Sequence, residues 1–489
     1  MNLTTFLQEG LAYVLRLCYT EAVVQKQYKQ RNGGTEVMQA RAEGSLAHGP
    51  LGKQILRFSL PLMISNVLQV LFNMSDVAVV GRFSGARALG AVGSTTILVS
   101  LFTGFLIGMG SGVNALVARY LGADSREETE HTVHTAAILC LLVGAVLLGL
   151  GLIFARPMLT LLHTKAELID GAALYLHIYF LGMPAMALYN FGNGVLSAAG
   201  DTRRPLVYLL IAGILNVCLN LFFVIVCRMS EDGVALASIL SQYLSAALIL
   251  IALFRSREDY ALRLRKLRLH AEKAKMLLNL GLSAGFQNAI FAVANLFIQS
   301  AVNSFSTVVV EGNSAASNAD SLVYDVMAAF HTACASFIGQ NFGAGHRDRV
   351  KKSYFISVSY SCAFGTVLGL LLVFFGSGFL ALFTDDPAVA QEGMIRLRVM
   401  GLSYGVSAFM DCTIAASRGL GKCVVPTIIV IAGSCVFRVL WVYTVFAYFG
   451  TLLSLYLMYA FSWTITAIAE IIYFRHTYRK QMALEPAAT

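Results

Sequence analysis

The sequence has too little charge to form a water-soluble particle. Only 13% of its 489 residues are Asp, Glu, Lys or Arg, whereas 57% are hydrophobic. Soluble globular chains usually carry about 25% charged residues, so this chain cannot cover its surface with groups that suit water. The shortage excludes an ordinary soluble domain and indicates that most of the surface faces a lipid bilayer.

Clusters of metal-binding or catalytic residues are also missing. The nine cysteines are spread singly and none forms a Cys-x-x-Cys pair, so we interpret them as small buried hydrophobic residues. The sequence contains no His-rich metal constellation, nucleophile elbow or phosphate-binding glycine loop. We therefore expect no cofactor, and a membrane-bound enzyme or a channel is the least favoured class.

Twelve apolar stretches, each long enough to cross a bilayer as a helix, fill the rest of the chain. They are too long for strands and lack the alternation of a half-buried strand, so the predicted fold class is an all-α polytopic membrane protein. The expected spans are 56–80, 91–118, 132–154, 172–198, 205–228, 235–255, 278–303, 318–340, 352–376, 396–418, 424–447 and 454–475.

Lysine and arginine are unevenly divided between the two sides of these spans. From residue 51 onward, 23 fall on one side and 7, Arg396 and Arg398 among them, on the other, while Arg438 lies inside a span. The richer side is expected to be the cytoplasm, so both termini are cytoplasmic and the protein crosses the cell membrane many times. This topology accounts for the net charge of +9 without a nucleic-acid partner.

The spans and loops predict five parts of the chain. They are a cytoplasmic N-terminal extension (1–50), a six-helix lobe (51–255), a basic cytoplasmic linker (256–275), a second six-helix lobe (276–476) and a cytoplasmic tail (477–489). We expect the linker to be solvated rather than bound to lipid headgroups. A polar lead-in begins only near Met38, so a translation start there is an alternative to Met1.

Two short motifs recur at the same separation of 221 residues. Val117–Ala123 matches Ile338–Ala344, and Ala199–Pro205 matches Leu420–Pro426. A glycine after a helix end accepts left-handed backbone, and a proline suits the first turn of the next helix. Because the separation spans six helices, the halves share one orientation and a pseudo-twofold axis runs along the membrane normal. This is a transporter architecture, with a cavity between the halves.

These motifs resemble those of the multidrug and toxic compound extrusion (MATE) family. The resemblance implies a V-shaped fold of two lobes and a cation-coupled antiporter, which exports organic, often cationic, compounds in exchange for H⁺ or Na⁺. A flippase for lipid-linked precursors is the alternative, less favoured because only one arginine lies within a span. We expect a monomer. The matching segments include Phe58–Pro61, Asp76–Phe83, Gly194–Arg203, Asn216–Asn220, Gly339–Gly345 and Arg418–Lys422.

Asp76 is the leading candidate for ion coupling, because a carboxylate inside a span is costly. It lies on one helical face with Gln69 and Asn73, and Asn216 and Asn220 share a face of the fifth span. The resemblance implies that these asparagines and Ser238 complete a cation or proton site with Asp76. Many family members have Asp in place of Asn220 and Thr in place of Ser238. Either Na⁺ binds at Asp76, Asn216 and Asn220, or Asp76 alone takes up a proton, which we slightly favour.

Polar and methionine side chains at helical spacing are expected to line the substrate cavity. Asp411 is included because some relatives carry an acidic residue in the tenth span, although the aligned position is Ser407. Glu311 and Asp320 are expected to be hydrated near the outer end, and Glu470 to reach or pair at the cytoplasmic end. The predicted cavity residues are Gln69, Asn73, Met183, Asn190, Asn288, Asn295, Gln299, Asp325 and Asp411.

The coupling residues have no polar counterparts in the second half. At a separation of 221 residues, Asp76, Asn216, Asn220 and Ser238 correspond to aromatic positions. We therefore expect coupling to lie mainly in the first lobe, with the repeat supplying the symmetry. The aromatic counterparts are Phe297, Phe437, Trp441 and Tyr459.

Overall fold

The computed structural model describes residues 46–484, and all regular structure in that range is helical. Ten helical stretches there are long and apolar enough to cross a membrane, and a bent helix pair makes an eleventh. The first stretch, Leu51–Gly122, has 72 residues and breaks at Gly85, whose φ of 87° favours glycine. It therefore supplies two crossings, and the predicted twelve spans are present.

The first lobe holds six spans. They are α3 (Leu51–Val79), α4 (Gly85–Gly122), α5 (Arg126–Leu161), the pair α6 (Ala166–Leu181) and α7 (Met183–Ala198), α8 (Arg203–Leu221) with the π-helical turn η2 (Phe222–Val226), and α9 (Glu231–Arg255). The turn η1 (Val80–Ser84) joins α3 to α4. The fourth span differs from the single helix predicted, because it bends by 46° between α6 and α7. Pro184 in the first turn of α7 lacks the N–H that would continue α6.

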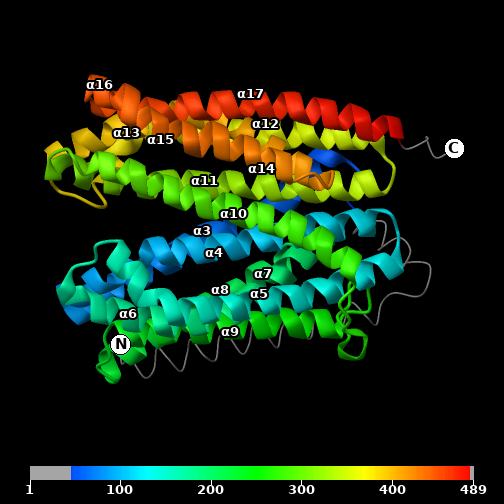
Figure 1. Ribbon diagram of the computed structural model, residues 1–489, viewed down its shortest axis with the longest axis horizontal. Coiled ribbons are helices and arrows are strands. Elements are labelled where there is room, and N and C mark those ends of the chain that lie inside the picture. The colour runs from blue at the N-terminus through cyan, green and yellow to red at the C-terminus, as the bar shows by residue number, and fades with distance from the viewer. Residues whose placement is uncertain (1–45, 485–489) are drawn as a thin grey trace.

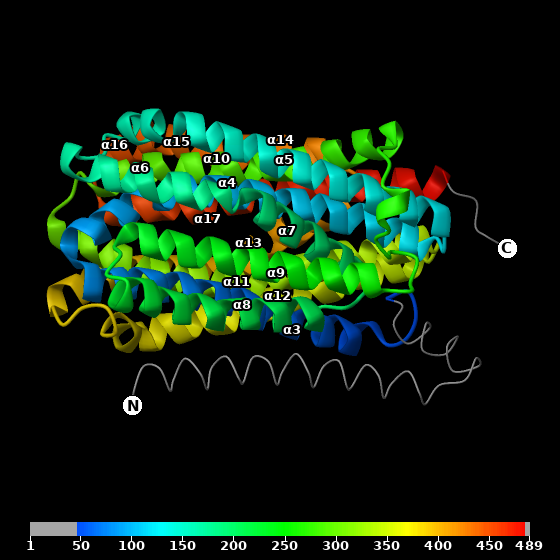
Figure 2. The same cartoon turned by 90° about the horizontal axis from the view of Figure 1, so that it is seen from below.

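The second lobe holds the other six. They are α10 (Ala271–Val302), α11 (Thr307–Gly343), α12 (Arg347–Leu380), α13 (Pro387–Gly419), a composite span of α14 (Val424–Val430), η4 (Ile431–Val436), α15 (Phe437–Trp441), η5 (Val442–Phe446) and α16 (Ala447–Phe449), and α17 (Leu452–Leu484). In Figure 1 this lobe forms the upper layer and the first lobe the lower layer. Figure 2 shows the same helices running along the long axis of the molecule.

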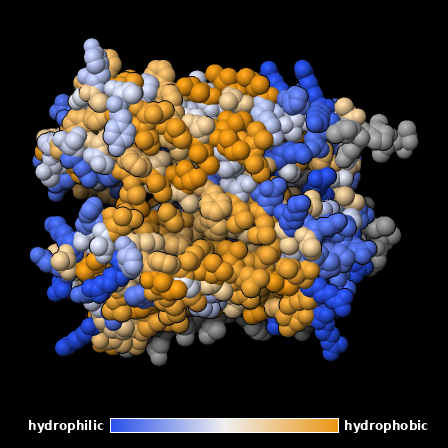
Figure 3. Space-filling view, viewed as in Figure 1, coloured by the Kyte–Doolittle hydropathy of each residue, from blue (hydrophilic) through white to orange (hydrophobic). Residues whose placement is uncertain are grey.

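On the face drawn in Figure 3, hydrophobic residues form a broad belt across the middle, and hydrophilic residues gather at the two ends. The end on the right of Figures 1 and 3 carries the linker, the start of α3 and the end of α17. It also carries the start of α12 with Arg347 and Arg349. We call it the basic end. The belt is what a chain crossing a bilayer requires, so the protein is a multi-pass membrane protein.

The linker contacts the basic end of α5, while most of its side chains are exposed. Lys266 pairs with Glu130 at 2.7 Å, and Arg126 pairs with Asp259 at 3.3 Å. The backbone N–H of Arg263 donates to Nε2 of His134 at 3.0 Å. These contacts give the linker a fixed path between the lobes. The proposed start at Met38 falls outside the described residues.

The repeated glycines serve two different purposes. Gly200 and Gly421 have φ of 88° and 76°, so the predicted left-handed turns before α8 and α14 are confirmed. Gly122 and Gly343 instead end α4 and α11 as helical residues. A Cβ on either would overlap the backbone of the facing helix. The two copies of this motif therefore pack on each other, and the small residues let the lobes approach closely.

Contacts between the lobes extend from the middle of the molecule to the basic end. Asn66 of α3 donates to the carbonyl oxygen of Asp325 at 2.8 Å, and Asn288 of α10 donates to that of Gly104 at 2.9 Å. Closer to the basic end, Asn114 of α4 and Ser336 of α11 exchange hydrogen bonds of 3.0 and 3.1 Å. The lobes are therefore joined over this half of the molecule.

A polar latch closes the basic end. Gln340 of α11 accepts from the N–H of Leu46 at 2.9 Å and donates to the carbonyl oxygen of Ala198 at 2.6 Å. Asn341 and Arg349 also donate to the carbonyl oxygen of Leu46, at 3.2 and 3.3 Å. These bonds tie the second lobe to the segment that enters α3 and to the end of α7.

Candidate functional site

Asp76 lies where three helices of the first lobe meet. Asn220 of α8 donates from Nδ2 to Asp76 Oδ1 at 2.5 Å. Ser238 of α9 donates from Oγ to Asp76 Oδ2 at 3.1 Å. Both carboxylate oxygens therefore have a donor, and each donor comes from a different helix. Asp76 itself is half-buried.

Asn216 completes this group, because its Nδ2 donates to Ser238 Oγ at 3.4 Å and its Oδ1 accepts from Asn220 at 3.3 Å. Asn216 and Asn220 are one helical turn apart on α8, so both face α3 and α9. Asn216 is 6% exposed and Asn220 is fully buried. The structure thus brings together the four residues predicted for ion coupling, which we call the Asp76 cluster.

Two tyrosines form the wall of this site on α6. Tyr175 and Tyr179 are buried, stack with 5.9 Å between ring centroids, and interact electrostatically with Asp76. Within the described residues, no group of three or more His, Cys, Asp or Glu residues is placed to hold a metal ion. The Asp76 cluster thus offers one carboxylate in a setting of amides, a hydroxyl and phenols.

The orientation of the Asn220 amide decides which atoms the site offers to an ion. A hard cation is bound by oxygen atoms, but the group that Asn220 turns toward Asp76 is its amide N–H. The Oδ1 atom of Asn220 is buried without a partner in the described part of the chain. Na⁺ would require the Asn220 amide to turn over, which would break its bond to the carboxylate. With the amide as placed, the Asp76 carboxylate receives a hydrogen bond, whereas the turned-over amide would offer Na⁺ the oxygen atom Oδ1.

The predicted cavity residues of the first lobe have different surroundings. Gln69 and Asn73 are exposed on α3, on the same helical face as Asp76. Asn190 is half-buried and donates to the carbonyl oxygen of Met186 at 2.9 Å. Met183 is fully buried in the hydrophobic core of this lobe, so in this conformation it packs rather than lines open space.

The predicted cavity residues of the second lobe are spread over α10, α11 and α13. Asn295 is exposed, and Asp325 and Asn288 are half-buried at the lobe interface. Gln299 donates to Asn303 at 2.8 Å. Asp411 is 9% exposed and accepts from Ser407 at 3.1 Å. They lie on a different lobe from the Asp76 cluster.

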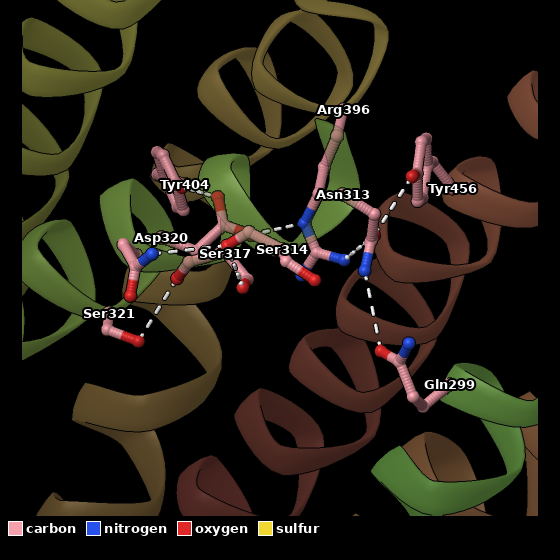
Figure 4. A network of polar contacts seen from close by, with 10 residues as sticks. Gln299, Asn313, Ser314, Ser317, Asp320, Ser321, Arg396, Tyr404 and Tyr456 are labelled. Atoms are coloured by element: carbon pink, nitrogen blue, oxygen red, sulfur yellow. Dashed lines mark hydrogen bonds and ion pairs between the residues drawn. The ribbon is translucent and has the colours of Figure 1, made fainter. Parts of the chain in front are cut away.

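Asp320 is not hydrated as expected but belongs to a buried network (Figure 4). Its carboxylate accepts from Arg396 Nε at 2.7 Å and from the hydroxyl of Tyr404. Arg396 also donates to Asn313 Oδ1 at 2.6 Å, and so does Tyr456 at 2.9 Å. Arg396, counted from the sequence among the charges of the outer side, is therefore an interior residue of α13, and is 8% exposed.

A second buried arginine is held by aromatic rings. Arg438 of α15 is 3% exposed and donates to Ser462 Oγ at 3.0 Å. Its guanidinium lies over Tyr459 at 4.6 Å and near Trp463 at 5.8 Å. Tyr459 is one of the aromatic counterparts predicted from the repeat, so the position that is polar in the first lobe contains a cation–π contact in the second.

Glu470 of α17 also departs from expectation, because it neither reaches solvent nor pairs. It is fully buried, and both carboxylate oxygens lack a hydrogen-bond partner among the described residues. Sequence reasoning missed the burial of Glu470 and of the Asp320 network, although a signal was present. Each is a charge within a span, and such a charge is a functional candidate by default.

Two lobes of six membrane-spanning helices, related by an internal repeat, form the architecture of a transporter. A family model, MatE, matches the chain twice, over residues 61–222 and 284–444, once in each lobe. The chain therefore belongs to the MATE family, as the sequence motifs predicted.

Known relatives agree with this assignment. The chain is 28% identical to the probable multidrug resistance protein YpnP of Bacillus subtilis over 78% of this chain and 86% of that one. It is 27% identical to the FAD transporter of Shewanella oneidensis, covering 74% and 80% of the two chains. A solved MATE transporter in an outward-facing conformation superposes with a TM-score of 0.83 at 23% identity, covering 90% of this chain and 98% of that chain.

Proposed function

We propose that this protein exports small organic compounds by exchanging them for protons bound at Asp76. Membership of the MATE family and the multidrug relatives support export of organic substrates. The Asp76 cluster carries the coupling part of the proposal. Burial favours a neutral carboxyl, whereas the bonds from Asn220 and Ser238 favour the carboxylate, so both forms have support at this site.

The positive-inside rule places the basic end in the cytoplasm, together with both termini. The lobes are joined from the middle of the membrane to that end by the contacts of Asn114, Gln340 and Asn341. The arrangement therefore represents a state closed to the cytoplasm. In this state Asp76 receives a proton and the substrate leaves.

The return step requires the lobes to separate at the basic end. Opening breaks the latch around Gln340 and separates Gly122 from Gly343, while the helices within each lobe stay packed. Once the cavity faces the cytoplasm, Asp76 releases its proton and a substrate binds. A proton and a substrate thus compete for the same carrier. This competition couples proton entry to substrate export.

The test is substrate uptake into everted membrane vesicles under an imposed pH gradient. Asp76→Asn keeps the shape of the side chain but removes the proton site, and we expect it to abolish gradient-driven uptake at normal expression. Glu311→Gln is the matched control, because Glu311 is an exposed carboxylate at the far end of α11. Wild-type uptake by Asp76→Asn would refute the assignment.

A further inference from the structure

Glu470 differs from the other buried acidic residues of the second lobe. Asp320 accepts from Arg396 and Tyr404, and Asp411 accepts from Ser407. Glu470 has neither a donor for a carboxylate nor an acceptor for a carboxylic acid among the described residues. A buried polar group without a partner costs free energy, so this arrangement requires an explanation.

Arg418, near the basic end of α13, is the charged neighbour of Glu470. Its charge interacts with Glu470 on α17 and also with Asp411. The Nη2 group of Arg418 donates to Gln287 Oε1 of α10 at 2.8 Å, but its Nε is buried without a partner in the described range. Arg418 therefore holds α10 in this state and has one buried donor without a partner among the described residues.

The remaining titratable groups around α17 are engaged elsewhere. The elements packed against α17 are α13, α14, η4, α15 and η5, and α12 reaches it through Tyr354, whose ring lies 4.6 Å from that of Phe474. The Tyr354 hydroxyl bonds to Thr413 at 2.9 Å. On these, Asp411 bonds to Ser407, and Arg438 bonds to Ser462 beneath its aromatic rings. Cys435 is the titratable group of η4, α14 carries none, and Tyr443 of η5 is exposed at the far end. Arg438 also keeps one buried group, Nη2, without a partner in the part of the chain that the structure describes, but Arg418 is the cation whose charge acts on Glu470. Arg418 is thus the partner expected for an ionised Glu470.

We propose that Glu470 is a second proton-binding site, in which proton loss draws Arg418 from Gln287 to the Glu470 carboxylate. Protonated Glu470 is neutral and leaves Arg418 on α10, which is the arrangement in this structure. Deprotonated Glu470 is an uncompensated charge in the membrane, and a charge-assisted bond from Arg418 stabilises it. This change of partner would break the bond from Arg418 of α13 to Gln287 of α10. Proton loss at α17 would therefore affect α10, the helix that packs against α4 of the other lobe. This inference rests on the proposed proton coupling.

The site can be tested with dicyclohexylcarbodiimide, which adds to protonated carboxyls in apolar surroundings. We expect mass spectrometry of the purified, lipid-reconstituted protein to find the reagent on Glu470. The labelled fraction should fall about tenfold for each pH unit above the point at which the proton leaves. Labelling that is absent, or the same at acidic and alkaline pH, would show that Glu470 does not exchange a proton.

A transport measurement separates this site from Asp76. In proteoliposomes, we expect Glu470→Gln to retain export while the number of protons exchanged per substrate falls by one, and Glu470→Asp to preserve the wild-type ratio. An unchanged ratio in Glu470→Gln overturns the inference while leaving the role of Asp76 intact. Coupled export by Asp76→Asn would instead refute the proposed function. If Glu470→Gln fails to fold, the labelling of the wild-type protein still decides.

Discussion

Removing the Arg396 side chain should strongly destabilise the second lobe. Arg396→Met keeps most of the apolar stem but leaves Asp320 as a buried carboxylate without its cation, and leaves Asn313 without one donor. Breaking a buried ion pair in this way costs about 3–5 kcal/mol. For a folding unit of 150–250 residues, this corresponds to a fall of roughly 6–20 °C in the unfolding midpoint.

Intrinsic fluorescence is well suited to measuring this loss. The chain has two tryptophans, Trp441 and Trp463, and both lie in the second lobe. The ring of Trp463 lies 6.5 Å from that of Tyr404, which bonds to Asp320. Thermal unfolding of the purified protein should therefore report on this lobe directly.

A double mutant controls for the general effect of altering the core. Asp320→Leu combined with Arg396→Met removes both charges, and we expect it to be more stable than Arg396→Met alone, because no uncompensated charge remains. If Arg396→Met lowered the free energy of unfolding by less than about 1 kcal/mol, the reasoning would be refuted, because an exposed ion pair contributes that little. A double mutant as unstable as the sum of the single mutants would also contradict it.

Three further predictions concern other contacts. Lys266→Met breaks an exposed ion pair with Glu130 and should cost less than about 1 kcal/mol in the same unfolding assay; a loss as large as that of Arg396→Met would contradict the distinction. Ser238→Ala removes one donor to Asp76 and should slow pH-driven export severalfold, with Ser238→Thr active; equal rates would count against that bond. Gln340→Ala removes two bonds between the lobes, each worth about 1 kcal/mol, and should lengthen the spin-label distance between Asp124 and Asp348; an unchanged distance would argue against the latch.

The spans and the repeat could be predicted because they depend on local properties of the sequence. Apolar length determines where a helix crosses the bilayer, and one shared separation of 221 residues relates the two lobes. The meeting of Asn216 and Asn220 with Asp76 also followed from helical spacing and family resemblance. The bend after Leu181 was missed although Pro184 signalled it, because a proline near a helix start and one at a kink look alike in sequence.

The buried charges could not be placed because they depend on how helices rotate against one another. Asp320 and Arg396 are 76 residues apart on α11 and α13, and only the packing of these helices brings them together. Arg396 was placed at the outer end of the span 396–418 and counted with the charges outside the membrane, because an arginine near the end of a span usually lies there. Glu470 was misjudged for the same reason, because nothing in its local sequence shows that this face of α17 is buried.

The most direct test of the account is proton release from the purified protein on substrate addition. In weakly buffered detergent solution with a pH indicator, a drug that the wild-type protein exports should displace a proton from Asp76. We expect wild-type protein and Glu311→Gln to acidify the solution on drug binding, and Asp76→Asn to lose the signal from that carboxyl. Proton release by Asp76→Asn equal to that of the wild type would contradict the central claim that protons and substrates compete through Asp76.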